Sequence, residues 1–563
     1  MPAAASFESG TSDRPLLYRT VDGVLKAAAA AGPERPALVV PYQSLRFTFA
    51  EFDRAVEGIA RGMIACGLEP GERIGIWAPN CAEWVLTLFA AARAGLTLVN
   101  LNPAYRTMEM DFALRLVGCR ALVFAPRFKT SDYAGMLASL IPGLEAAAPG
   151  RLVCDAFPEL RLLVQLGKVP LAGTLSFEDL AAAGHDLDET VLASIESRVD
   201  PDDVFNIQFT SGTTGTPKGA ALTHFNIVNN GFFVGEGMGL TADDRVCIPV
   251  PLYHCFGMVL GVLAAMTHGA ASILSGDGFD PVAVLTTVAN ERCTALHGVP
   301  TMFIAQLEHP RFGEFDLSSL RTGIMAGSPC PTAVMRRVIA EMHMPEVTIC
   351  YGMTETSPVS FQSRPDDTLE RRVGTVGRVH PHVQVKIIDA EGRVTPRGVA
   401  GELLTRGYSV MRGYWNDPER TRDVIDAGGW MHTGDLAIID EHGYCNIVGR
   451  VKDIIIRGGE NVSPREIEEF LYLHPAVFDV AVVGVPDVKY GEEVCACIQL
   501  RAGMTVSEED IREFCRGRIA HYKVPRYVRF MDSFPLTISG KVQKYLMREH
   551  MRAELKLAEQ AHA

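Results

Sequence analysis

Apolar residues recur at two spacings along the N-terminal part of the chain, and each spacing predicts one type of element. After Thr48, apolar side chains follow at helical spacing as far as Met63, and Thr48 with Glu51 forms a capping box that marks a helix start. Short apolar runs predict strands at 73–78, 96–100 and 121–125, and residues 82–93 predict a helix. The alternation resumes after residue 200 and continues to about residue 350. This pattern predicts an α/β fold with parallel sheets covered by helices on both faces.

The spacing of apolar runs and turns changes twice toward the C-terminus. Between about residues 370 and 450, short alternating runs lie between Gly-rich turns, which predicts a small twisted β region. After Gly449, strands are expected at 452–458, 480–486 and 494–500, with a helix over 507–517 and a second capping box at Ser463–Glu466. This stretch is long enough for a separate domain. We therefore expect an N-terminal domain over 1–450 and a small, mobile α+β domain over 451–563.

One long uncharged run is a candidate for a membrane span. Val246–Thr267 is about 22 residues, which is long enough to span a bilayer. Pro249 and Pro251 interrupt its first half, which favours a buried strand, an irregular loop and a buried helix over a membrane span. The N-terminal segment lacks an apolar core of signal-peptide length, and its acidic residues argue against a transit peptide.

Charge and cysteine usage narrow the possible partners and the compartment. Lys and Arg total 53 and Asp and Glu total 67, for a net charge of −14, so neither nucleic acid nor an anionic membrane is an expected partner. The 13 cysteines are scattered without a C-x-x-C pair, which indicates buried thiols in a reducing, cytoplasmic compartment. Cys495 and Cys497 share one strand face, which favours core packing over a metal site.

The most informative motif is TSGTTGTPKG at residues 210–219, directly after a strand-like run. Its glycines allow tight turning and close approach to a ligand, and its hydroxyls and Lys218 suit polyphosphate oxygens. It is not a P-loop, because Pro217 precedes Lys218 and Gly219 follows it. The less favoured alternative is a flexible surface loop. The predicted phosphate-binding residues are Thr210, Ser211, Gly212, Thr213, Thr214, Gly215, Thr216, Pro217 and Lys218.

This segment resembles the phosphate-binding signature of the acyl-adenylate-forming enzymes, which include acyl-CoA synthetases, aryl-CoA ligases, luciferases and peptide-synthetase adenylation domains. Four further motifs of that superfamily stand in the same order: YGMTE (351–355), TGD (433–435), GRVKD (449–453) and LTISGK (536–541). The resemblance covers about residues 20–555. Stretches such as NPAYRTMEM and IRGGENVSPREIE are most similar to the medium-chain acyl-CoA synthetases, in particular the branch named acyl-CoA synthetase family member two.

The resemblance implies a reaction between two anions, in which a carboxylate attacks the α-phosphorus of ATP and pyrophosphate leaves. Charge must be neutralised at the point of attack, partly by Mg²⁺ on the phosphates. Glu355 is expected to contact Mg²⁺, and Thr354 the α-phosphate. Asp435 is expected to accept both ribose hydroxyls, with Arg450 beside it. Gly327 and Tyr351 are expected beside the adenine.

The resemblance also assigns the cation at the reacting atoms and the path of the thiol. Lys541 is expected to reach from the C-terminal domain and bridge the carboxylate and the α-phosphate. His254 matches a position between the acyl site and the thiol path, with a buried core histidine as the alternative. Lys452 is expected to be the hinge of a rotating C-terminal domain. Gly458 and Gly459 are expected to line the tunnel for coenzyme A.

The sequence therefore predicts an ATP- and Mg²⁺-dependent acid–thiol ligase that converts a medium-chain fatty acid to acyl-AMP and then to acyl-CoA. Three alternatives stay open: an aryl-acid CoA ligase, a stand-alone adenylation enzyme that loads a carrier protein, and a nucleotide-binding pseudoenzyme. Every position with a named chemical role is filled, which argues against the pseudoenzyme. The expected partners are fatty acid, ATP and coenzyme A, and a homodimer is left open.

Replacing the bridging cation separates the two half-reactions. We expect Lys541→Ala to nearly abolish acyl-AMP formation, because no ammonium then offsets the charge that builds at phosphorus. Thioester formation from supplied acyl-AMP is retained, and measuring the two half-reactions separately checks this. An equal loss of both would contradict the role of Lys541.

Overall fold

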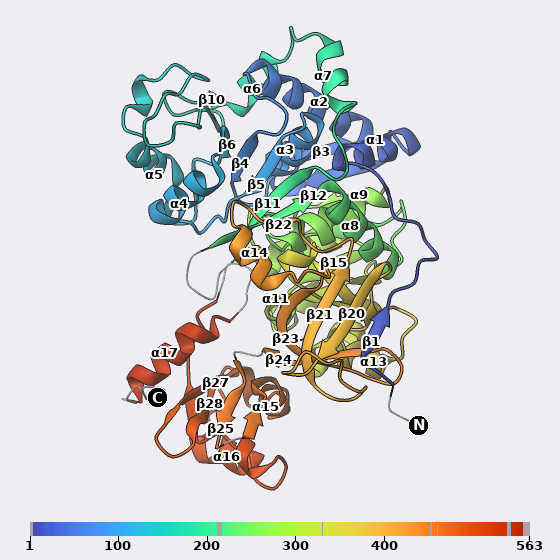
Figure 1. Cartoon of the computed structure of the whole chain (residues 1–563), viewed down its shortest axis with the longest axis vertical. Helices are drawn as coiled ribbons and strands as arrows, with labels where there is room; N and C mark the ends of the chain where they lie inside the picture. Colours follow the sequence, from blue (N-terminus) through green and yellow to red (C-terminus); the bar gives the residue numbers. More distant parts are fainter. Residues whose placement is uncertain are drawn as a thin grey trace.

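A computed structural model describes residues 4–210, 217–328, 330–450, 453–458, 460–536 and 542–555. Two large sheets with helices between and around them form the upper part of Figure 1, an antiparallel sheet lies beside them, and a smaller C-terminal domain lies below. The predicted α/β class, with a large N-terminal domain and a smaller C-terminal domain, is confirmed.

The first large sheet has a parallel core and two antiparallel strands at one edge. Its order is β10-β9-β6-β4-β5-β11-β12-β22. The strands are β4 (Arg73–Trp77), β5 (Thr97–Asn100), β6 (Ala121–Phe124), β9 (Leu162–Gln165), β10 (Leu175–Ser176), β11 (Val204–Thr210), β12 (Lys218–Thr223) and β22 (Gly413–Tyr414). The antiparallel pair β11 and β12 flanks the TSGTTGTPKG segment, in agreement with the strand predicted before it.

The second large sheet also has a parallel core, with antiparallel strands at both edges. Its order is β19-β18-β17-β16-β15-β13-β14-β2-β3. The strands are β2 (Pro36–Val40), β3 (Leu45–Thr48), β13 (Arg245–Cys247), β14 (Ala271–Ile273), β15 (Ala295–Gly298), β16 (Thr322–Ala326), β17 (Glu346–Gly352), β18 (Val359–Gln362) and β19 (Arg378–Val379). β16 ends directly before Gly327, and β17 ends within the YGMTE motif, at Gly352.

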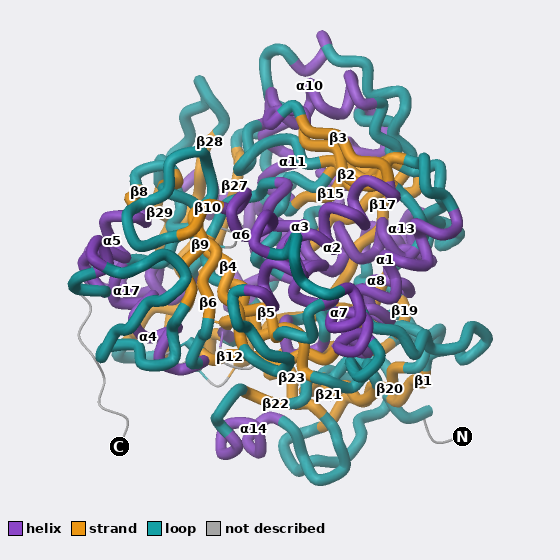
Figure 2. Tube along the Cα trace, turned by 90° about the horizontal axis from the view of Figure 1, so that it is seen from above, coloured by secondary structure: helices purple, strands orange, loops and turns teal. Residues whose placement is uncertain are grey.

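A layer of buried helices separates the two sheets. α3 contacts β4 and β5 of the first sheet, and its neighbour α2 contacts β2 and β3 of the second. α3 (Ala82–Arg93) is buried on every side, because both of its faces meet other elements. The view from above in Figure 2 shows these helices among the strands. The helices of the N-terminal part are α1 (Val21–Ala31), α2 (Phe49–Ala65), α3, α4 (Thr107–Val117), α5 (Tyr133–Leu140), α6 (Phe177–Ala183), α7 (Glu189–Glu196), α8 (His224–Met238), α9 (Ala264–Thr267), α10 (Pro281–Glu291), α11 (Pro300–Leu307), α12 (Thr332–Glu341), α13 (Leu369–Gly374) and α14 (Pro418–Val424).

The predicted capping box and the predicted uncharged run are both found. Thr48 and Glu51 cap α2 reciprocally. The run Val246–Thr267 forms part of β13, a loop, the π-helix η3 (Phe256–Leu263) and α9, which confirms the predicted order of strand, loop and buried helix. A π-helix is rare and often marks a functional site. Among the described residues, no helix combines the length and apolar character needed to cross a bilayer.

The twisted β region predicted before residue 450 is an antiparallel sheet with the order β1-β20-β21-β23-β24. The strands are β1 (Phe7–Ser9), β20 (Val383–Ile388), β21 (Gly401–Gly407), β23 (Met431–Ile439) and β24 (Cys445–Arg450). A small hairpin elsewhere pairs β7 (Arg127–Phe128) with β8 (Ser131–Asp132). The pairing of β23 with β24 sets Asp435 directly opposite Arg450.

The C-terminal domain packs three helices on its own sheet. The elements are β25 (Ile455–Arg457), β26 (Glu460–Val462), α15 (Pro464–Leu471), β27 (Val477–Asp487), β28 (Gly491–Leu500), α16 (Glu508–Cys515), β29 (Tyr527–Phe530) and α17 (Lys544–Glu554). Cys495 and Cys497 are buried on one face of β28, in a cluster with Met547 and Met551 of α17. Their predicted core packing is confirmed.

The capping box predicted at Ser463 is wrong. Ser463 is the N-cap residue and Pro464 the first residue of α15, but the Ser463 side chain makes no capping hydrogen bond. Its hydroxyl donates to the carbonyl of Val448 on β24, which holds the side chain against the third sheet, and its oxygen accepts no N–H from the first turn of α15. Arg465 Nη1 donates to the Ile447 carbonyl at 2.6 Å, so this helix start joins the C-terminal domain to the third sheet.

Candidate active site

The motif residues converge where strands of both large sheets end and the antiparallel sheet approaches. β11 ends at Thr210, β16 leads into Gly327, and β17 leads into Thr354 and Glu355. Ligands of open α/β sheets bind at the carboxyl ends of the strands. The structure therefore brings together segments that are more than 100 residues apart in the sequence.

The carboxylate of Glu355 is buried where the two sheets meet. Glu355 Oε1 accepts hydrogen bonds from Thr210 Oγ1 at 3.3 Å and from the Tyr414 hydroxyl at 2.9 Å. The backbone carbonyl of Glu355 accepts from the Met411 amide at 2.9 Å. Glu355 comes from the second sheet, whereas Thr210 and Tyr414 come from the first. One acidic side chain therefore joins the end of β11 to the YGMTE segment.

Tyr414 connects this carboxylate to Lys218. The Lys218 Nζ lies 4.8 Å from the centre of the Tyr414 ring, within cation–π distance. Burial, and then the neighbouring Glu355, raise the pKa of Tyr414, so the phenol stays a hydrogen-bond donor. The sequence did not single out Tyr414. Its contact with Glu355 depends on the pairing of β12 with β22, which brings Tyr414 to the edge of the first sheet.

A second buried carboxylate, Asp435, lies beside the first group. Its Oδ2 accepts from the Tyr351 hydroxyl at 2.5 Å, and its Oδ1 accepts from Arg450 Nε at 3.1 Å. Burial, and then Asp435, raise the pKa of Tyr351. Burial lowers the pKa of Arg450, but Asp435, Asp453 and Tyr351 outweigh it and raise the value overall. Each carboxylate oxygen retains capacity for another donor, which suits the paired hydroxyls of a ribose.

His254 lies on the loop that enters the π-helix. Its Nδ1 accepts the backbone N–H of Phe256 at 3.1 Å. Because Nδ1 is an acceptor in that bond, the proton of a neutral ring resides on Nε2. The histidine is only half-buried, unlike the buried core histidine considered as an alternative.

Two glycines give the loops the shape that the site needs. Gly327 follows β16 with φ 92°, in the left-handed region that favours glycine. A Cβ on Gly352 would lie 1.7 Å from the Pro358 carbonyl oxygen, so only glycine fits before the Thr354 turn.

Some predicted residues are not part of this cluster. Gly458 lies on the C-terminal domain after β25, with φ 59°, and a Cβ there would lie 3.0 Å from the Tyr490 ring. The predictions for residues 211–216, Lys452, Gly459 and Lys541 fall outside the residues that the structure describes.

The oxygen atoms around Glu355 fit Mg²⁺. This ion prefers carboxylate, hydroxyl and water oxygens and is usually held by one or two carboxylates together with substrate phosphates. Glu355 supplies a carboxylate, and the hydroxyls of Thr210 and Tyr414 adjoin it. Within the described part of the chain, no group of three or more His, Cys, Asp or Glu side chains is arranged to hold a metal ion. The donor set therefore fits an ion that arrives with a nucleotide.

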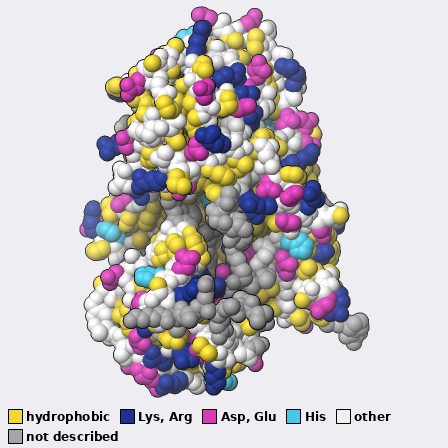
Figure 3. Space-filling model, turned by 60° about the vertical axis from the view of Figure 1, so that its left-hand side comes forward, with side chains coloured by type: hydrophobic (Ala, Val, Ile, Leu, Met, Phe, Trp, Pro, Cys, Tyr) yellow, Lys and Arg dark blue, Asp and Glu magenta, His cyan; other side chains and the backbone are white. Residues whose placement is uncertain are grey.

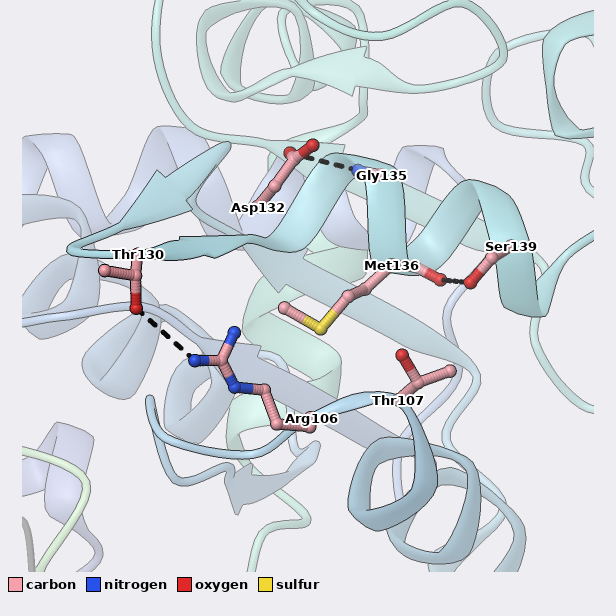
Figure 4. Close-up of a pocket in the computed structure, with 7 residues that line it drawn as sticks. All are labelled: Arg106, Thr107, Thr130, Asp132, Gly135, Met136 and Ser139. Atoms are coloured by element: carbon pink, nitrogen blue, oxygen red, sulfur yellow. Dashed lines mark hydrogen bonds between the residues drawn. The ribbon is translucent and has the colours of Figure 1, made fainter.

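A separate surface cleft of about 410 Å³ lies between α4 and α5. Figure 4 shows Arg106 pointing toward Thr130, whose hydroxyl it contacts at 3.4 Å. The other lining residues are Thr107, Asp132, Gly135, Met136 and Ser139. The cleft contains none of the residues that the motifs predicted.

Comparison with known proteins agrees with this geometry. A model of the AMP-binding enzyme family matches residues 25–415, and a model of the AMP-binding enzyme C-terminal domain matches residues 466–541. The chain belongs to the AMP-binding enzyme family. The family match spans the Glu355 cluster, and the match to the C-terminal domain ends at Lys541.

Individual members of this family are similar over nearly the whole chain. The Bacillus subtilis protein YngI is 49% identical over 95% of this chain and 97% of its own length. The zebrafish (Danio rerio) protein named medium-chain acyl-CoA ligase ACSF2, mitochondrial, is 47% identical over 98% of this chain and 91% of its own length. A crystal structure of the anthranilate CoA ligase AuaEII with anthranoyl-AMP superposes with a TM-score of 0.85 at 27% identity, covering 97% of this chain and 99% of that one.

On the face shown in Figure 3, basic and acidic side chains are interspersed, and no continuous basic patch is seen. A basic patch is the usual mark of a nucleic-acid-binding face.

Neutralising Asp435 is expected to weaken nucleotide binding. Asp435→Asn replaces one acceptor oxygen by a donor NH₂ group, and we expect the Kd for ATP to rise roughly tenfold, or about 1.4 kcal/mol. Calorimetric titration measures this. The matched control is Asp389→Asn, which changes a partly exposed turn carboxylate directly after β20 and is expected to leave the Kd unchanged. Equal affinities for all three proteins would exclude Asp435 from the nucleotide site.

Proposed function

We propose that the protein is an AMP-forming ligase that joins medium-chain fatty acids to coenzyme A. The observation that supports this most is the pair of buried carboxylates at the two ends of the YGMTE segment: Asp435 is bonded to Tyr351 at its start, and Glu355 is its last residue. Asp435, with Tyr351 and Arg450, suits a ribose, and Glu355, with Thr210 and Tyr414, suits the phosphate end of the same nucleotide. Full-length similarity to a medium-chain acyl-CoA ligase supports the choice of acid.

In the first half-reaction the fatty carboxylate attacks the α-phosphorus of ATP, and pyrophosphate leaves. The residues of the chain hold these two anions together and offset their charge. Thr354 donates its hydroxyl to the α-phosphate, and Lys218 supplies a cation at the phosphate-binding strand. His254 offers Nε2–H to the carboxylate, and Lys541 bridges the two reacting groups. When bound, Mg²⁺ is held by Glu355 and neutralises phosphate charge.

In the second half-reaction the thiol of coenzyme A attacks the acyl carbonyl and AMP leaves. The domain boundary lies at 450/451, and Lys452 is the hinge about which the C-terminal domain rotates. Gly458 and Gly459 then line the thiol path. The contact between Arg501 Nη1 and Glu308 Oε1 at 3.1 Å is partly exposed, and such ion pairs contribute little stability, so it does not resist rotation.

One alternative, an aryl acid, has specific support. An aryl acid is favoured by the structural similarity to an anthranilate CoA ligase, although the sequence identity to that protein is much lower than to the medium-chain ligase. A carrier protein in place of coenzyme A would use the same adenylate. We also propose a cytoplasmic location and leave a homodimer open. The name of the zebrafish relative assigns that protein to mitochondria.

A panel of free acids distinguishes these substrates. We expect pyrophosphate release to be fastest with octanoate to dodecanoate, and roughly tenfold slower with palmitate, coumarate, benzoate or anthranilate, because one or two buried CH₂ groups account for such a difference. Coenzyme A, not carrier protein, yields the thioester. Faster release with an aryl acid would contradict the fatty-acid proposal, and exclusive loading of carrier protein would contradict the ligase.

A further inference from the structure

Three buried amides lie side by side on one face of the first sheet, directly under the candidate active site. Asn100 ends β5, and Asn206 and Gln208 alternate along β11. The parallel register pairs Gln208 with Asn100, so all three side chains share a face. Each residue is at most 3% exposed. Buried strands of parallel sheets are usually continuous apolar runs, so three amides at this point need an explanation.

The amides form a directional chain of hydrogen bonds, which we call the amide relay (Asn100, Asn206, Gln208). Gln208 Nε2 donates to Asn206 Oδ1 at 2.8 Å, and Asn206 Nδ2 donates to Asn100 Oδ1 at 2.9 Å. Asn100 Nδ2 then donates to the Tyr253 carbonyl at 3.0 Å. A buried polar network is stable only when all of its groups are paired, so each link depends on the others.

Both ends of the amide relay are hydrogen-bonded to the segment that carries His254. At one end, Asn100 donates to the carbonyl of Tyr253, the residue before His254. At the other end, the thiol of Cys255, the residue after His254, donates to Gln208 Oε1 at 3.1 Å. Cys255 is fully buried. The backbone on both sides of His254 is thus fixed to the strand that leads into the phosphate-binding loop.

Cys255 also reaches the third part of the site. The side chains of Thr354 and Glu355 lie close to its thiol, and burial raises its pKa to about 12, so it is a neutral thiol and not a nucleophile. One sulfur atom therefore contacts both the amide relay and the residue proposed to bind the α-phosphate.

We propose that Gln208 and Cys255 are positioning residues of the adenylation step, which hold His254 and Thr354 in register with the phosphate-binding strand. The inference rests on the proposed function, because it assumes that His254 and Thr354 act on the carboxylate and the α-phosphate. Neither Gln208 nor Cys255 touches substrate in this scheme. Their removal loosens the reacting geometry and leaves the ribose contacts at Asp435 in place.

The test compares Cys255→Ala, which removes the thiol donor, with Cys255→Ser, which retains a donor in a similar volume. Rapid-quench measurement of the first turnover gives two quantities: the amplitude of pyrophosphate release, which counts active sites, and its rate constant. We expect Cys255→Ala to lower the rate constant about tenfold at unchanged amplitude, with the KM for ATP within about twofold. Cys255→Ser is expected to restore the rate to within about threefold of wild type.

A second variant tests the link to the amide relay. Gln208→Met keeps the length of the side chain and removes both hydrogen bonds, and it is expected to match Cys255→Ala. Combining the two substitutions adds no more than about a further twofold loss, since both act through one network. Cys247→Ala is the matched control, because Cys247 is equally buried on β13 and lies outside the relay. It is expected to leave the rate unchanged.

The acid used is the one that wild type activates fastest, so a preference for another acid contradicts the medium-chain proposal and not the positioning roles. A loss of amplitude without a change in the rate constant would show a purely structural role and overturn the inference. Equal rates for wild type, Cys255→Ala and Gln208→Met would overturn it too. A wild type that releases no pyrophosphate with any acid would contradict both proposals.

Discussion

A buried carboxylate joins the two large sheets at the candidate site. Glu355 leaves the second sheet and accepts hydrogen bonds from Thr210 and Tyr414 of the first. A buried carboxylate needs such partners, because an unpaired charge in a low-dielectric interior is strongly destabilising. The same arrangement suits the proposed catalysis: a carboxylate held between hydroxyls at the end of β11 offers the oxygen ligands that a phosphate-bound Mg²⁺ prefers.

Local signals in the sequence predicted much of the fold. The helical spacing after Thr48, its capping box and the apolar runs at β4, β5 and β6 are encoded within a few residues. The Ser463 capping box failed because a tertiary hydrogen bond to the Val448 carbonyl holds the side chain against the neighbouring sheet, where it does not cap the helix. Local patterns contain no information about such a competitor.

The residues of the candidate site also fall into two groups, those that local motifs predict and those that only the fold reveals. Asp435, Arg450, Tyr351 and Glu355 could be named from motifs, and the structure brings them into two adjoining groups. Tyr414, Gln208 and Cys255 could not, because their roles depend on strand pairing and on contacts across 47 to more than 100 residues. An isolated Gln in an apolar strand has no local feature that reveals its partner. The register of β5 against β11 supplies that information.

The central claim is that one acyl-adenylate occupies the space between the two carboxylates and His254. A crystal structure with a stable analogue, 5′-O-(N-decanoylsulfamoyl)adenosine, tests it most directly. The account predicts the ribose hydroxyls on the carboxylate of Asp435, the sulfamoyl group beside Thr354 and the alkyl chain running past His254. Binding of the analogue elsewhere on the chain, or a ribose turned away from Asp435, would contradict it.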